Sequence, residues 1–147
     1  MEKDKTIHSW YCEKLREIGE RLRFKTSWDS LEEKELYHLA NPDCIWYLEL
    51  PAELTTISDL PEKIPLIAFE LLYSEKEKNM RGSFGSFLLR GAYYGVFVLL
   101  KPEDQSQEEF LKRDKYLRKM INNLGSKHLK VWYAETADSL ANKFGIN

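Results

Sequence analysis

Two carboxylates in apolar surroundings are the residues best suited to chemistry in this chain. Asp43 follows Pro42 and opens the stretch DCIWYLEL, and Glu70 is the single charge in the run LIAFELL. An unpaired buried carboxylate is costly, so Glu70 predicts a bound cation or a polar partner. If the two segments pair as antiparallel strands, both carboxylates reach one edge of the sheet. Mg²⁺ or Mn²⁺ would find oxygen ligands there and could activate water against a phosphodiester.

Both residues also have plainer interpretations. Glu70 could lie on an edge strand, facing solvent or bonding a lysine, and Asp43 could be a turn residue. A second feature is the segment Arg81-Gly82-Ser83-Phe84-Gly85-Ser86. Glycines and serines at a helix start allow a phosphate to approach backbone amides, but the same glycines could serve close packing of the helix on the sheet. The segment is not a Walker loop, because the GK[ST] ending is absent.

The remaining candidate groups carry less information. The three histidines are scattered without metal-ligand spacing and are interpreted as surface or satisfied residues. Cys12 and Cys44 are too few for a disulfide framework, have no nearby base by sequence and fall on expected core elements. We therefore expect a reduced, cytoplasmic protein without nucleophilic cysteine chemistry.

Hydrophobic periodicity and chain breakers predict the elements that must position these residues. Helices are expected over 9–23 (with Ser9 as N-cap), 30–39, 75–90, 106–123 and 136–144, and strands over 24–28, 43–50, 66–72, 93–100 and 129–134, with a loop over 51–65. An antiparallel meander followed by strand–helix–strand crossovers gives a mixed sheet. The expected fold is therefore α/β, a three-layer sandwich with a central mixed sheet in a single domain spanning 1–147.

Composition and charge limit the class of protein. The chain has 147 residues, of which 43% are hydrophobic and 31% charged, as in a single globular domain. The longest apolar run, Gly91–Leu100, is half of the roughly 20 residues that span a bilayer, so no membrane partner is expected. The net charge of −2 excludes a strongly basic coat protein.

The near-neutral total conceals an asymmetry. Residues 1–73 carry 15 acids and 9 bases, whereas residues 74–147 carry 9 acids and 13 bases. The basic excess gathers at 76–81, 112–119 and 127–130. These segments are either solvated helix faces or a basic face that meets phosphate.

The pattern resembles the PD-(D/E)XK nuclease superfamily, the restriction-endonuclease-like fold that includes Holliday-junction resolvases. The likeness covers roughly residues 9–134: a leading helix, a meander carrying Pro42-Asp43, an apolar strand carrying Glu70, then a helix and another apolar strand. It implies that Asp43 and Glu70 bind Mg²⁺, that an acidic residue of the first helix assists, and that the substrate is DNA. By position, that helix offers Glu13, Glu17 or Glu20. By analogy with enzymes that cut two strands symmetrically, it also implies a homodimer.

One position departs from the family pattern. The motif ends Glu-x-Lys, and Leu72 stands in place of the lysine. In some members the positive group comes from the following helix. Lys76, Lys78 and Arg81 are the candidates here, and Lys78 and Arg81 are expected to take that catalytic role. Lys76, Lys78, Arg81, Ser83 and Ser86 are the expected nucleic-acid contacts.

Two alternatives to a metal-dependent DNA nuclease remain open. One is a catalytically inactive relative that binds nucleic acid or a protein partner, as the missing lysine suggests. The other is an unrelated α/β module in which Glu70 forms a buried ion pair.

Overall fold

The computed structural model describes residues 2–27, 42–73 and 90–146 of the chain, together with residues 80, 82, 84, 85 and 87. Within these residues the elements are α1 (Glu2–Arg21), β1 (Lys25–Ser27), β2 (Cys44–Glu49), α3 (Ala52–Ser58), β3 (Lys63–Leu72), β4 (Tyr94–Leu99), α5 (Gln107–Leu124), β5 (Leu129–Tyr133) and α6 (Ala134–Lys143). The helix expected over 30–39 lies outside the described residues.

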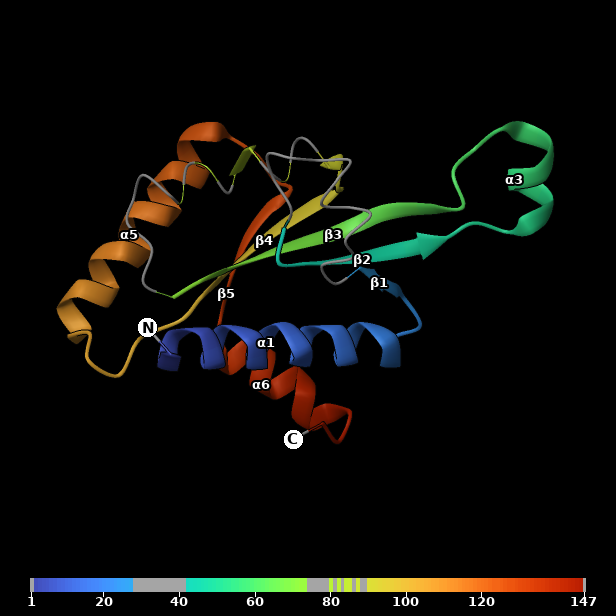
Figure 1. The fold of residues 1–147 in the computed structure, drawn as a ribbon. Coiled ribbons are helices and arrows are strands. Elements are labelled where there is room, and N and C mark those ends of the chain that lie inside the picture. Colours follow the sequence, from blue (N-terminus) through green and yellow to red (C-terminus); the bar gives the residue numbers. More distant parts are fainter. Residues whose placement is uncertain are drawn as a thin grey trace.

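The strands form one mixed sheet in the order β1-β2-β3-β4-β5. β1, β2 and β3 pair antiparallel, whereas β3, β4 and β5 run parallel. Figure 1 shows α1 and α6 below the sheet, α5 on its other side, and α3 at the tip of the long β2–β3 hairpin. The predicted α/β fold with a central mixed sheet flanked by helices is therefore confirmed.

The β2–β3 hairpin departs from the sequence expectation. Residues 51–65 were expected to be a loop, but they contain α3 and the first residues of β3. Pro51 has φ −57°, which suits the position before a helix, and Asp59 ends α3 in the left-handed region at φ 58°. Pro65 lies within β3, although proline has no backbone N–H to donate to a neighbouring strand. It pairs with Tyr47 next to the register shift between Trp46 and Tyr47, and proline is tolerated at such an irregularity.

The observed helix ends show which boundaries local sequence signals predict correctly. α5 begins as predicted, because the Ser106 side chain accepts a hydrogen bond from the Glu109 N–H at 3.1 Å. It ends at Gly125, whose φ of 61° is the left-handed cap conformation. Two other starts were predicted too late. α1 continues upstream of Ser9 as far as Glu2, and α6 begins at Ala134, with the Thr136 hydroxyl accepting from the Tyr133 N–H at 3.5 Å.

Two apolar clusters fill the faces of the sheet. One packs the strands against α1 and α6, and the other packs them against α5 and the helical residues Met80 and Phe87. Trp46 is central to the first cluster. Its side chain is 2% exposed, its ring stacks on Phe24 with 5.5 Å between centroids, and its indole Nε1–H donates to the Leu15 carbonyl at 3.0 Å. Trp46 thus holds α1 against β2.

Gly19 allows this close contact between α1 and β2. A Cβ at Gly19 would lie 2.5 Å from Trp46 Nε1 and 2.9 Å from Thr26 Cγ2. We expect Gly19→Ala to destabilise the protein by about 1–3 kcal/mol through overpacking, although alanine gains about 1 kcal/mol of helix propensity. Urea unfolding followed by tryptophan fluorescence measures the difference.

Gly82 is the matched control for this substitution. It is exposed and helical, and a Cβ there meets nothing within 4 Å among the described surroundings. Gly82→Ala should leave stability unchanged or slightly higher. An equal rise in the unfolding midpoint of both variants would contradict the packing argument.

Candidate functional site

Asp43 lies directly before β2, beside the end of β3. The β2–β3 ladder includes the pair Cys44–Phe69, so the next positions outward are Asp43 and Glu70. The Leu71 N–H donates to Asp43 Oδ2 at 2.8 Å. The predicted antiparallel pairing of these segments is therefore confirmed, and Asp43 is held against the strand that carries Glu70.

Glu70 occupies the face of the sheet that packs against α5. Its neighbours Phe69 and Leu71 belong to the cluster on the α1 face, whereas Ala68 and Leu72 belong to the cluster on the α5 face. Because side chains alternate along a strand, Glu70 shares the face of Ala68 and Leu72. It is partly buried, and its register partner on β4 is the buried Phe97. Glu70 is thus a carboxylate at the margin of an apolar core.

The family's lysine position is occupied by a core residue. Leu72 is 1% exposed and packs in the same cluster as Met80 and Phe87. No cation can act from this position without rebuilding the core. The groups expected to compensate, together with the other expected DNA contacts, lie outside the described residues: Lys76, Lys78, Arg81, Ser83 and Ser86. Their roles stay predictions.

The first helix brings different residues to Asp43 from those expected. His8 Nε2 lies 3.1 Å from Asp43 Oδ1, and Cys12 Sγ lies 3.7 Å from His8 Nδ1. Each of the three residues can offer one ligand atom such that all lie within 4.8 Å of one another. Among the described residues, His8, Cys12 and Asp43 form a cluster of three side chains that could hold a metal ion. The cluster includes none of the predicted first-helix glutamates.

Two of the three predicted glutamates form ion pairs with Arg16. Glu13 Oε1 lies 2.6 Å from Arg16 Nη2, and Glu20 Oε1 lies 2.7 Å from Arg16 Nη1. Glu17 is partly buried on the same helix. Ligation by Glu13 or Glu17 stays a prediction, whereas the first-helix residue in contact with Asp43 is His8.

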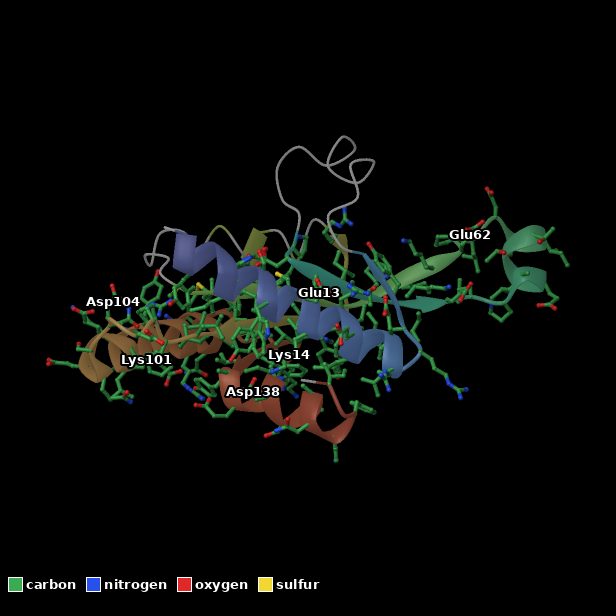
Figure 2. All side chains as sticks on the ribbon, turned by 60° about the horizontal axis from the view of Figure 1, so that its bottom comes forward. Glu13, Lys14, Glu62, Lys101, Asp104 and Asp138 are labelled. Carbon is green, nitrogen blue, oxygen red and sulfur yellow. The ribbon has the colours of Figure 1, made fainter. Side chains whose placement is uncertain are left out.

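A polar clamp fixes the orientation of α1. Lys14 is 8% exposed, and its Nζ lies 3.0 Å from Asp138 Oδ1 on α6 and 3.6 Å from the centroid of the Trp10 ring. Figure 2 shows Lys14 and Asp138 at the contact between the two helices. The Tyr11 hydroxyl also donates to Asp138, and burial together with this carboxylate raises the pKa of Tyr11 to about 12. The clamp holds the helix that carries His8 and Cys12.

The second cysteine has no accessible chemistry. Cys44 is 1% exposed, and burial, with a further effect of the adjacent Asp43 charge, raises its pKa to about 12. Its thiol therefore stays protonated at neutral pH, as expected for a core residue.

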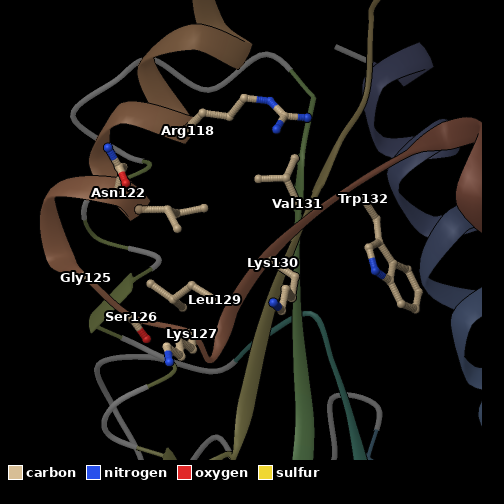
Figure 3. Close-up of a pocket in the computed structure, with 10 residues that line it drawn as sticks. Arg118, Asn122, Gly125, Ser126, Lys127, Leu129, Lys130, Val131 and Trp132 are labelled. Atoms are coloured by element: carbon tan, nitrogen blue, oxygen red, sulfur yellow. The ribbon is translucent and has the colours of Figure 1, made fainter.

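Two of the three basic segments meet at a cavity of about 610 Å³ beside β5 (Figure 3). Arg118 comes from α5, Lys127 from the turn before β5 and Lys130 from β5, and Leu129 and Trp132 add apolar surface. Tyr133, at the end of β5, donates from its hydroxyl to Asp114 at 2.6 Å and accepts from Arg118. β3 and β4 lie between β5 and β2 in the sheet, so this basic surface is separate from the Asp43 site.

Comparison with known proteins identifies no relative. No family model, curated sequence or solved structure matches the chain. Within the part of the chain that the structure describes, none of the helices has the length and apolar character required to cross a bilayer.

Proposed function

We propose that this protein is a metal-dependent DNA nuclease in which Asp43 and Glu70 hold Mg²⁺ or Mn²⁺. The observation that carries the proposal is the register of the β2–β3 hairpin. It makes Asp43 and Glu70 the next pair of residues outward from Cys44 and Phe69, with Asp43 anchored by the Leu71 N–H. Carboxylate oxygens are the donors that these hard cations select. The element order of helix, antiparallel meander and parallel crossover is also the one on which the nuclease resemblance rests.

The chain's own groups have distinct tasks in this mechanism. The Leu71 N–H orients the Asp43 carboxylate through Oδ2, so Oδ1 keeps a fixed direction toward the partly exposed His8. Glu70 would contribute its carboxylate from the margin of the apolar core, where interactions between charges are stronger than in bulk water. When bound, the cation would supply Lewis-acid activation of water and neutralise charge on the phosphate. The basic second half supplies cations that attract the phosphate backbone.

A cleavage assay tests the proposal. Purified protein is incubated with supercoiled, linear and single-stranded DNA, with Mg²⁺ or Mn²⁺ and with excess chelator. We expect nicking or cleavage that requires the metal and is restored when metal is returned after chelation. Cleavage that persists in chelator would contradict the assignment, because neither carboxylate has a role without a cation.

A second function is favoured by two observations. Leu72 is buried where the family has its lysine, and Arg118, Lys127 and Lys130 gather at the cavity beside β5. A non-catalytic relative would bind nucleic acid through that surface. DNA binding in an electrophoretic mobility assay, with no cleavage under any metal condition, would select this function. Sedimentation in the presence of DNA would also test the predicted homodimer.

A further inference from the structure

Three side chains with different donor atoms converge where α1 passes the start of β2. His8 offers ring nitrogen, Cys12 offers sulfur and Asp43 offers oxygen, and the ligand atoms lie within 4.8 Å of one another. We propose that these residues form a binding site for Zn²⁺. This site is separate in its chemistry from the proposed Mg²⁺ site, although Asp43 belongs to both.

The donor set selects the metal. Zn²⁺ binds nitrogen, sulfur and oxygen ligands together, whereas Mg²⁺ and Ca²⁺ take oxygen ligands almost exclusively. Three protein ligands leave a fourth tetrahedral position for water or another small ligand. A thiolate and an imidazole beside a carboxylate therefore indicate a zinc-class cation.

The three ligands are already held in place by other contacts. His8 and Cys12 are four residues apart on α1, so they share one face of the helix. The helix is fixed by the Lys14–Asp138 ion pair and by the Trp46 indole. The Asp43 carboxylate is oriented by the Leu71 N–H, the kind of outer contact that tunes metal ligands.

The site is open to a metal from one side. The side chains of His8 and Asp43 are 34% and 22% exposed, whereas Cys12 is 4% exposed and forms the floor. His8 now directs Nε2 to Asp43 and Nδ1 to Cys12, and a single Zn²⁺ takes only one of these nitrogens. With bonds of about 2.0–2.3 Å, the ligand atoms must draw together by about 1 Å, which side-chain rotation supplies.

Metal binding would also change the state of Cys12. The thiol proton passes to solvent as the zinc–sulfur bond forms, because the thiolate is the form that ligates the metal. The same three residue types occur in thiol hydrolases. Here Cys12 lies on the core side of α1, so a substrate carbonyl has no access to its sulfur.

Titration with Co²⁺, a coloured substitute for Zn²⁺, tests the site directly. The protein is stripped with chelator, kept reduced with a phosphine, and titrated with Co²⁺ while absorbance is recorded. We expect one equivalent to give a thiolate-to-cobalt charge-transfer band in the near ultraviolet, and Zn²⁺ to displace it. Absence of this band at stoichiometric Co²⁺ would overturn the proposal.

Variants identify the ligands. Cys12→Ser should abolish the band, and His8→Gln and Asp43→Asn should each weaken binding by more than about tenfold, since even outer-shell changes cost this much. Cys44→Ala and His128→Gln are matched controls that should retain the band. A band that survives in Cys12→Ser would also overturn the site, provided that circular dichroism shows folded protein.

The zinc site and the nuclease proposal can fail separately. Glu70→Gln should keep Co²⁺ binding, because Glu70 is not part of this group. If Glu70→Gln loses DNA cleavage and retains the cobalt band, both proposals stand. If the wild-type protein cleaves DNA but gives no cobalt charge-transfer band, only the zinc-site proposal is wrong. If it gives the band but does not cleave DNA, only the nuclease proposal is wrong.

Discussion

Asp43→Asn and Glu70→Gln are each expected to lower the rate of metal-dependent DNA cleavage by about 10³-fold, which corresponds to about 4 kcal/mol in activation free energy. Each substitution replaces a carboxylate of the proposed metal site by a neutral amide of the same shape. The amide is a much weaker ligand for a hard cation, while most packing contacts are kept. In Asp43→Asn the amide oxygen can still accept from the Leu71 N–H. The measurement is the initial rate of plasmid nicking at saturating Mn²⁺.

Glu49→Gln is the matched control for these two variants. Glu49 lies on the same hairpin but at the exposed end of β2, opposite Lys63, and it has no place in the proposed site. Its cleavage rate should equal that of wild type. If all three variants cleave equally well while remaining folded by thermal unfolding, the Asp43–Glu70 metal site is wrong.

Trp46→Ala should have the largest effect on stability. Removing a large buried aromatic side chain costs about 3–5 kcal/mol, which is a large part of the 5–15 kcal/mol that typically stabilises a domain. Trp46 contacts Phe24, Phe69 and Trp132 and donates to the Leu15 carbonyl. Its loss should therefore loosen α1 as well as the sheet, and equilibrium urea unfolding by circular dichroism measures this.

Two further tryptophan variants separate the contributions. Trp46→Phe keeps most of the apolar packing and loses the indole N–H, so a loss smaller than that of Trp46→Ala is expected. Trp10→Ala removes a side chain that is 45% exposed and lies over Lys14, so a loss of about 1 kcal/mol is expected. A larger loss from Trp10→Ala than from Trp46→Ala would refute the central role of Trp46.

Much of the fold could be predicted from local signals. β2, β4, β5 and α5 carry apolar patterns bounded by Pro, Ser or Gly, and each is observed within about two residues of its expected ends. α3 could not be foreseen in the same way, because none of its residues is buried and its apolar residues Leu54 and Ile57 are exposed. Its start and end depend on the fixed φ of Pro51 and the left-handed conformation of Asp59.

The site was predictable only where strand pairing determined it. Asp43 and Glu70 are neighbours in the register of an antiparallel pair, which follows from their places on two adjacent strands. Their joint role in metal binding stays a prediction. The N-cap signal at Ser9 predicts a helix that begins after His8, so the prediction separates His8 from Cys12, whereas α1 contains both residues. The four-residue spacing of His8 and Cys12 was the available signal. That spacing indicates a metal site only if Asp43 lies against the same face of the helix, and sequence spacing does not reveal this contact.

The order of the strands in the sheet, β1-β2-β3-β4-β5, is also their order along the chain. Each strand can therefore join the edge left by the previous one, and no strand has to insert between two that are already paired. Such sequential pairing keeps loop closure short and suits a chain that emerges from the ribosome N-terminus first. The hairpin that carries Asp43 and Glu70 can form while the basic C-terminal half is still being synthesised. The residues of the proposed metal site would thus be in place before the basic residues beside β5 are synthesised.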